Sequence, residues 1–207
     1  MMIENYIYKP ERYYQYKMSF AHEFKEILKA WIAISIAFGI LILQSGKTLL
    51  FSMGVAAITV GLGFLAHELS HRYYARKFGK HAEFKANNVM LLVAIIMSFL
   101  GFIIAAPGAV IISGFVNRRE GGIIATAGPA ANLILALIFL PLIFIIPSIA
   151  YYGMMINAWL ALFNLIPFPG FDGRRIMEWR KPVYFLMVGI AVVANVIHII
   201  LSNYAPI

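Results

Sequence analysis

The chain has 207 residues, of which 62% are hydrophobic and only 13% are charged, and its formal net charge is +8. It contains no cysteine, which excludes disulfides and thiolate metal sites. Several apolar runs reach the length of about 20 residues that a membrane-spanning helix needs. We therefore expect an all-α polytopic membrane protein embedded in a lipid bilayer. No soluble domain remains to carry a basic patch for nucleic acid, so we expect no nucleic-acid partner.

The first 26 residues are basic and aromatic rather than apolar. They contain four Glu and five His, Lys or Arg residues, and they lack the apolar core of a cleavable signal peptide. We expect residues 1–26 to be a cytoplasmic segment. No Ser/Gly-rich linker, low-complexity tract or internal repeat follows, which predicts a single membrane-embedded domain over residues 1–207.

Five apolar segments are predicted to cross the membrane. The short loop QSGK reverses the chain between the first and the second, and Pro141 and Pro147 interrupt the third near its end. The fourth ends in the proline-rich stretch PFPGFDG. In chain order, the segments are 30–43, 49–73, 121–150, 151–166 and 182–201.

The apolar segment 89–115 is interrupted by Pro107 and Gly108 and is too short for two full crossings. The loops before and after it are both basic, so both belong on the same side of the membrane. We expect a re-entrant or membrane-associated hairpin, whose broken backbone is covered by protein. A full crossing is the alternative, which would give six spanning helices. The start of this region, AEFKANNVM (82–90), is compatible with a short strand.

The distribution of the 17 Lys and Arg residues predicts the orientation, because only Lys47 lies outside four basic groups. By the positive-inside rule these groups face the cytoplasm, and so does the amino terminus. The sequence therefore predicts a multi-pass protein of the cell membrane. At 1.5 Å per residue, His67 lies about 27 Å along the second span from Leu49, which places it near the cytoplasmic face.

The second span ends in FLAHELSHRY (64–73), an unusual cluster of ionisable groups in an apolar helix. His67 and His71 are four residues apart, so on a helix they share one face and can bind one metal ion. Glu68 is placed to handle a proton of water at such a metal. Hydrolytic zinc typically has three protein ligands and a water molecule. The alternative is a polar rim at the membrane interface, which would place three costly groups at ligand spacing by accident.

A third ligand has to be a histidine or a carboxylate, because there is no cysteine. Asp172 is the one aspartate in the chain, and it lies at the inner end of the fourth span, on the same side as His67 and His71. We prefer it as the third ligand, since two histidines and a carboxylate complete a hydrolytic zinc site. The alternatives are an ion pair with Arg174 or Arg175, or an N-cap for a following helix.

Three motifs in this order resemble the site-2 protease family of intramembrane zinc metalloproteases: HELSH (67–71), GPAAN (128–132) and NLIPFPGFDG (164–173). The family pattern is HExxH, a GPxxN-like element and N-x-x-P-x-x-x-x-D-G. The stretch AAPGAV (105–110) is similar to one in archaeal-type members. The resemblance covers about residues 61–177. The members that the sequence resembles are the compact ones, which lack the PDZ or CBS domains that many other members carry. The fixed places of the third motif are matched by Asn164, Pro167, Asp172 and Gly173.

The resemblance implies one Zn²⁺ per chain, held by His67, His71 and Asp172, with Glu68 as the catalytic base. It also implies that Asn132 and Asn164 hold the substrate or its transition state. An amide there could donate to the oxyanion of a tetrahedral intermediate. Alternatively, Asn132 only links helices.

The remaining motif residues suggest structural roles. Gly128 and Pro129 could serve only to let helices approach closely. Pro167, Pro169 and Gly170 cannot sustain a helix and could leave backbone groups free to pair with an extended substrate. The hairpin around Pro107 could pair in the same way by strand addition.

We therefore expect an intramembrane zinc metalloprotease that hydrolyses a peptide bond within or near a transmembrane segment of a membrane-protein substrate. The alternatives are a catalytically inactive homologue and a metal-binding or transport membrane protein. A transporter would more often show paired polar helices or an internal repeat. In an inactive homologue, nothing would require Glu68 at its position.

Overall fold

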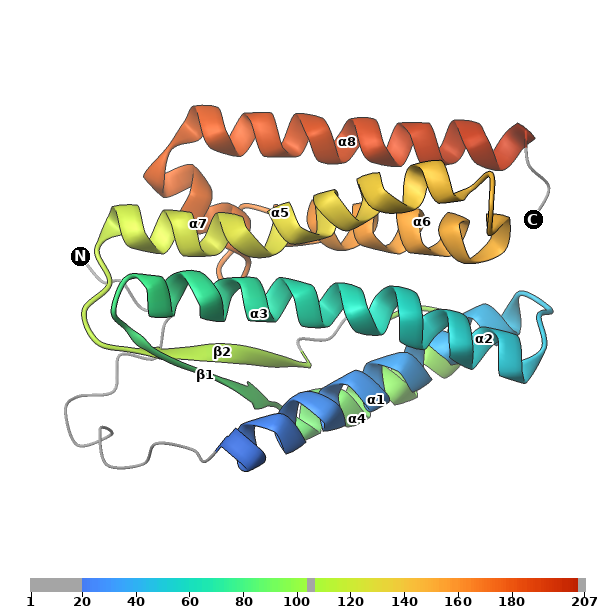
Figure 1. Ribbon diagram of the computed structural model, residues 1–207, viewed down its shortest axis with the longest axis horizontal. Coiled ribbons are helices and arrows are strands. Elements are labelled where there is room, and N and C mark those ends of the chain that lie inside the picture. The colour runs from blue at the N-terminus through green and yellow to red at the C-terminus, as the bar shows by residue number, and fades with distance from the viewer. Residues whose placement is uncertain (1–19, 104–106, 205–207) are drawn as a thin grey trace.

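The computed structural model describes residues 20–103 and 107–204 as a bundle of helices lying roughly side by side, with a small sheet at one end (Figure 1). Four of the described helical segments are long and apolar enough to cross a membrane: Phe20–Gln44, Leu49–Lys77, Arg118–Leu142 and Lys181–Leu201. This confirms the predicted class of helical polytopic membrane protein. The described elements are α1 (Phe20–Gln44), α2 (Leu49–Ala56), the π-helical turn η2 (Ala57–Gly61), α3 (Leu62–Lys77), β1 (His81–Ala86), α4 (Asn88–Phe99), β2 (Gly108–Ser113), α5 (Arg118–Leu142), α6 (Pro147–Asn164), α7 (Asp172–Trp179) and α8 (Lys181–Tyr204).

Helix α1 begins ten residues before the predicted span, at Phe20, because two glutamates in its first turns find partners in the sheet. The backbone N–H of Phe84 donates to Glu23 Oε1 at 3.0 Å, and that of Ala86 donates to Glu26 Oε2 at 3.1 Å. Residues 20–26 are therefore helical and continue without a break into the first span. The rest of the predicted amino-terminal segment, 1–19, lies outside the described residues.

The second span is one continuous helix made of α2, η2 and α3, and it runs from Leu49 to Lys77. Its π-helical turn lies directly before α3, the helix that carries HELSH. A π-helical turn shifts the hydrogen-bond ladder by one residue, and such turns are frequent at functional sites. The indole N–H of Trp31 donates to the carbonyl of Ala57 at 3.2 Å, which ties this turn to α1.

The predicted hairpin region is a strand, a short helix and a second strand. Helix α4 has 12 residues, so at 1.5 Å per residue it is about 18 Å long and too short to cross a bilayer. Strands β1 and β2 pair antiparallel, with Phe84 opposite Val110. The strand anticipated at the start of this region is therefore present. Ala105 and Ala106 of the AAPGAV stretch lie outside the described residues.

The boundary between the third and fourth predicted spans needs correction. Helix α5 ends at Leu142, and α6 begins at Pro147 rather than at Tyr151. Proline is favourable at the first position of a helix, where its missing N–H would have no helical partner in any case. Pro147 therefore starts α6 instead of interrupting α5. Helix α6 has 18 residues, includes Asn157 and Asn164, and is not among the four helical segments long and apolar enough to cross a membrane.

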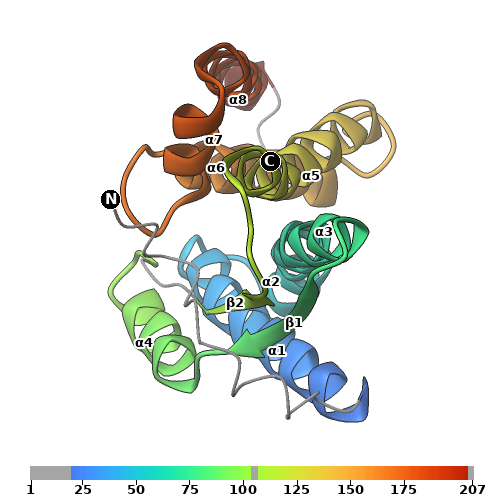
Figure 2. The ribbon, with the colours of Figure 1, turned by 90° about the vertical axis from the view of Figure 1, so that its left-hand side faces the viewer.

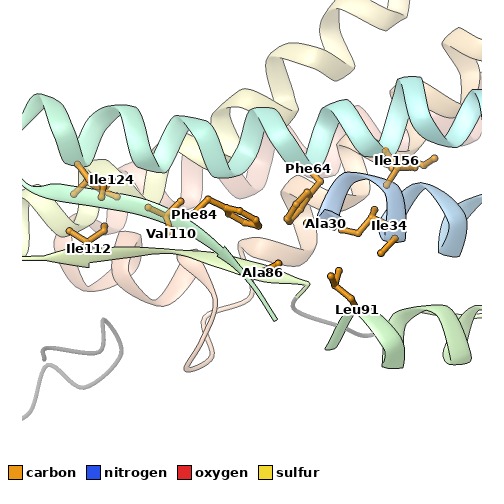
Figure 3. Close-up of a cluster of buried hydrophobic side chains, with 14 residues drawn as sticks. Ala30, Ile34, Phe64, Phe84, Ala86, Leu91, Val110, Ile112, Ile124 and Ile156 are labelled. Carbon is orange, nitrogen blue, oxygen red and sulfur yellow. The ribbon is translucent and has the colours of Figure 1, made fainter. Parts of the chain in front are cut away.

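The main apolar cluster joins α1, α3 and the sheet (Figure 3). Phe64 of α3 packs edge-to-face on Phe84 of β1, with ring centroids 5.9 Å apart. Ala30 and Ile34 of α1 belong to the same cluster, as does Val110 of β2. A view along the helices shows β1 between α1 and α3, with β2 beside it toward α4 (Figure 2). The sheet is thereby fixed against the helix that carries the predicted catalytic residues.

Candidate metal centre

Helix α3 presents His67 and His71 one turn apart on a single buried face. Both residues are less than 10% exposed, and their Nε2 atoms lie 3.0 Å apart. The face packs against α5, beside which α7 also lies (Figure 1). The spacing of four residues thus brings the two imidazoles together, as the sequence predicts.

A separate partner holds the Nδ1 atom of each imidazole. His71 Nδ1 lies 2.7 Å from the backbone carbonyl of Ile124, and His67 Nδ1 lies 2.7 Å from the side-chain oxygen of Asn132. A carbonyl oxygen only accepts hydrogen bonds, so each Nδ1 carries the proton. The lone pair of each neutral imidazole is then on Nε2, which is the arrangement expected of metal-binding histidines.

Asp172 comes from α7 and completes the group. Its Oδ2 atom lies 3.2 Å from Nε2 of both histidines, and the three ligand atoms lie within 4.8 Å of one another. The N-cap of α7 is Phe171, and Arg174 pairs with Glu178 at 2.8 Å. A carboxylate at this place would supply the negative charge of the group.

These three side chains fit a zinc ion. Oδ2 of Asp172 is buried without a hydrogen-bond partner, and it faces two nitrogen lone pairs. Three acceptors that converge without a proton between them need a cation. Atoms bound to a tetrahedral zinc at 2.0–2.1 Å are about 3.4 Å apart, close to the separations found here. Two imidazoles and a carboxylate, with room for water, are a typical hydrolytic zinc site.

Glu68 projects into a cavity of about 1450 Å³ that also reaches His67, His71 and Asp172. Glu68 as a residue is half-buried, and its carboxylate lies against the backbone N–H of Val110 in β2. The cavity is lined by α1, α4, β2, α6 and α7 as well as by α3. Glu68 is thus placed beside the three ligand candidates, on the side from which a substrate could approach.

The two predicted binding asparagines occupy different environments. Asn132 is fully buried and contacts His67, as described above. Both of its amide hydrogens have partners, namely the carbonyl of Gly63 at 3.0 Å and Oδ1 of Asn157 at 3.0 Å. Asn132 therefore contacts the metal centre through the imidazole of His67. Asn164 lines the cavity and donates to the carbonyl of Leu160 at 2.9 Å, which uses one of its two amide hydrogens.

The remaining motif residues have structural surroundings. Gly128 lies against the two imidazoles, where a Cβ atom would be 2.6 Å from Nε2 of His67. Pro129 is buried within α5. Pro167 is exposed in the non-helical stretch between α6 and α7. Gly173 packs on the backbone of Leu165 without space for a Cβ atom.

Two participants were missed by the sequence reasoning. Asn157 is fully buried in α6 and bonded to Asn132, and Val110 offers its backbone N–H to Glu68. The cost of an amide in an apolar span is a signal that could have pointed to Asn157. A backbone contact such as that of Val110 leaves no signal in the sequence.

The fold and this group of side chains define a multi-span helical membrane protein with a buried His–His–Asp centre, beside which a glutamate lies. Three curated proteins similar to the chain carry the name "Putative zinc metalloprotease": MJ0611 of Methanocaldococcus jannaschii, YwhC of Bacillus subtilis and Rip2 of Mycolicibacterium smegmatis. The chain is 39% identical to MJ0611 over 152 residues, which cover 70% of this chain and 79% of the relative. It is 32% identical to YwhC over 63% of this chain and 70% of the relative. It is 30% identical to Rip2 over 71% of this chain and 67% of the relative.

No protein-family profile matches the chain, and no solved structure matches it at a significant level. The three relatives nevertheless match most of their own length. The chain belongs to the site-2 protease family of zinc metalloproteases.

Proposed function

We propose that the protein is an intramembrane zinc metalloprotease that hydrolyses a peptide bond within or near a transmembrane segment of a membrane-protein substrate. The observation that carries this proposal is the convergence of His67, His71 and Asp172 on one point beside Glu68. We assign these three residues as the ligands of one Zn²⁺ per chain. When bound, zinc supplies Lewis acidity toward the scissile carbonyl and lowers the pKa of water.

Glu68 is the proposed general base and general acid. Its carboxylate takes the proton of the attacking water and later gives it to the leaving amine, so that the peptide bond is hydrolysed without net loss of a proton. Its place in the cavity puts it beside the ligand group. Asn164 has a second amide hydrogen that can donate to the carbonyl oxygen of the substrate as negative charge develops there.

One edge of the sheet faces the cavity at the site, which suits an extended substrate. The N–H groups of Phe84 and Ala86 point away from β2, toward Glu23 and Glu26, so these glutamates cover the outer edge of β1. In an antiparallel pair, residues directly opposite one another point the same way, both toward the partner strand or both away from it. Val110, opposite Phe84, therefore presents its N–H at the outer edge of β2, beside Glu68.

A substrate helix must unwind before its peptide bonds can be cut, because they are bonded within the helix in lipid. Pairing with the outer edge of β2 would replace those bonds and bring the substrate backbone to Glu68. The non-helical stretch around Pro167 is the second segment that could pair with the substrate in this way.

The orientation follows from the charges. We propose a multi-pass protein of the cell membrane whose amino terminus and basic loops are cytoplasmic. The sheet, α7 and the amino-terminal end of α5 lie at the end of the bundle that carries these loops (Figure 1). The centre would then act near the cytoplasmic face. Residues 1–207 would form a single domain whose partners are the lipid bilayer and a substrate with a transmembrane helix.

The test is a paired measurement on the detergent-purified protein. Zinc content and cleavage of a reconstituted single-span membrane protein are recorded for the wild type, Glu68→Gln and Asp172→Ala. We expect the wild type to hold about one zinc ion per chain and to cleave. Glu68→Gln keeps the zinc but loses about 10²–10⁴-fold in rate, the usual contribution of a general base. Asp172→Ala loses the metal.

Two results would contradict the proposal. If Glu68→Gln cleaves as fast as the wild type, Glu68 is not the base. If the wild type binds zinc but cleaves no membrane-protein substrate, the site serves metal binding or transport, or the protein is an inactive homologue.

A further inference from the structure

Asn157 lies at the middle of the packed interface of α6, and it is completely buried. Its amide nitrogen donates to the carbonyl of Gly153 at 2.9 Å, one turn earlier in α6. Its oxygen accepts a hydrogen bond from Nδ2 of Asn132 at 3.0 Å. Because the carbonyl of Gly153 can only accept, the Asn157 amide has one favourable orientation, with its oxygen toward Asn132.

The orientation of Asn132 is fixed by Asn157 together with the backbone carbonyl of Gly63. Nδ2 of Asn132 has two acceptors, Oδ1 of Asn157 and the carbonyl of Gly63, each at 3.0 Å. If the Asn132 amide were flipped, its oxygen would face two acceptors and two hydrogen bonds would be lost. The amide oxygen of Asn132 is therefore held toward Nδ1 of His67, 2.7 Å away.

The result is a hydrogen-bond chain with only one polarity, from His67 through Asn132 and Asn157 to the carbonyl of Gly153. At its far end is a backbone carbonyl, which cannot reverse its role. At its near end the proton of His67 is on Nδ1, which leaves the Nε2 lone pair beside Asp172. His71 has a backbone carbonyl as its direct partner, but His67 depends on a side-chain amide that could otherwise flip.

We infer that Asn157 is a positioning residue of the metal centre, which acts through Asn132 to fix the tautomer and orientation of His67. This inference rests on the proposed zinc site. Helix α6 would then contribute to the centre through Asn157 as well as through Asn164. Helix packing at this point is close, because Gly63 of α3 has no space for a Cβ atom against the Asn157 amide. The hydrogen bonds from His67 through Asn132 to Asn157 thus connect α3, α5 and α6 beside the metal centre.

The experiment is a double-mutant cycle on zinc affinity, measured by competition with a chelating dye on the purified protein. Partners of metal-bound histidines typically contribute about 10–100-fold in affinity, which is the loss expected for Asn132→Ala. For Asn157→Ala we expect a loss of about tenfold, the lower end of that range. If Asn157 acts through Asn132, the same substitution in the Asn132→Ala background changes the affinity by less than about twofold.

Asn195→Ala is the matched control. Asn195 is also a buried amide, and it links α8 to α6 through the carbonyl of Ala158 at 3.1 Å, outside the chain of hydrogen bonds to His67. It should lower thermal stability without changing zinc affinity. The absorption spectrum of bound Co²⁺ provides a second readout of ligand geometry, which should change in Asn157→Ala and not in Asn195→Ala. Asn157→Leu, which keeps the side-chain volume, replaces the alanine variant if that variant does not stay folded.

Several outcomes would overturn the inference: unchanged affinity in Asn157→Ala and Asn157→Leu, an equal loss in both backgrounds of the cycle, or an equal loss in Asn195→Ala. In each of these the wild type still binds zinc, so the proposed function stands. A wild type without zinc affinity would instead remove the proposed function itself.

Discussion

Gly128 lies directly against the imidazole of His71, with no space between them for a Cβ atom. Such an atom would also be only 2.6 Å from Nε2 of His67. It would therefore stand where the two Nε2 lone pairs meet. The glycine of GPAAN thus has a chemical role beyond allowing helices to approach, because it leaves open the space that the proposed zinc ion needs.

Gly128→Ala should abolish zinc binding, with a loss greater than the roughly 100-fold that partners of metal ligands can contribute. Gly189→Ala is the matched control, since Gly189 also lies inside a helix and a Cβ atom there would contact nothing within 4 Å. Zinc affinity and circular dichroism of both variants, purified in parallel, check this prediction. If Gly128→Ala binds zinc as the wild type does, the ion does not sit between the imidazoles.

Asp172→Asn tests the charge of the third ligand without changing its shape. The carboxylate is the anionic member of the set, and an amide is a poor zinc ligand, so zinc affinity should fall steeply. A strong chelator should remove the metal and stop cleavage in the wild type, and added zinc should restore both. Glu178→Gln is the control, because Glu178 is an exposed carboxylate of the same helix, paired with Arg174. Equal zinc affinities in the two variants would exclude Asp172 as a ligand.

The sequence predicted those parts of the site that depend on local spacing or on composition. His67 and His71 share a face because four residues make about one helical turn. Asp172 could be selected because it is the one aspartate in the chain. The structure brings all three together, and their binding of zinc remains a proposal.

The supports of the site could not be predicted, because they depend on packing between distant segments. The carbonyl of Ile124 is 53 residues from His71, and Asn132 is 65 residues from His67. Glu23 was placed in a cytoplasmic segment, but it is buried against β1 and pairs with Arg72 at 2.6 Å. A hydrophobicity pattern treats such a glutamate as a reason to end the span, whereas its partners in the fold allow the helix to continue.

The natural absence of cysteine makes the proposed orientation directly testable. Ser45→Cys places a thiol in the exposed turn after α1, and Lys77→Cys places one at the exposed end of α3. In intact cells, a membrane-impermeant maleimide should label the cysteine at 45 and not the one at 77. Permeabilised cells, in which both should react, are the control. The opposite labelling pattern would place the amino terminus outside and move the centre to the other face of the membrane.

The final prediction concerns the outer edge of β2. Glu23 and Glu26 cover the other edge of the sheet, so a single extended chain can be added, beside Glu68. An extended chain directs alternate N–H groups toward its neighbour. Two peptides that span the cleaved bond of the test substrate, N-methylated at odd or at even positions, should therefore differ in binding.

The peptide whose methyl groups face away from β2 should compete with cleavage about as well as the unmethylated parent. The other peptide cannot donate hydrogen bonds to β2 and carries methyl groups at the contact. Its inhibition constant should therefore rise by about tenfold or more. This change corresponds to the loss of one or more hydrogen bonds of about 1 kcal/mol each. Equal inhibition by both peptides would mean that the substrate backbone does not pair with β2. The non-helical stretch between α6 and α7, whose Gly170 and Phe171 line the cavity, would then be the next segment to test for pairing with the unwound substrate.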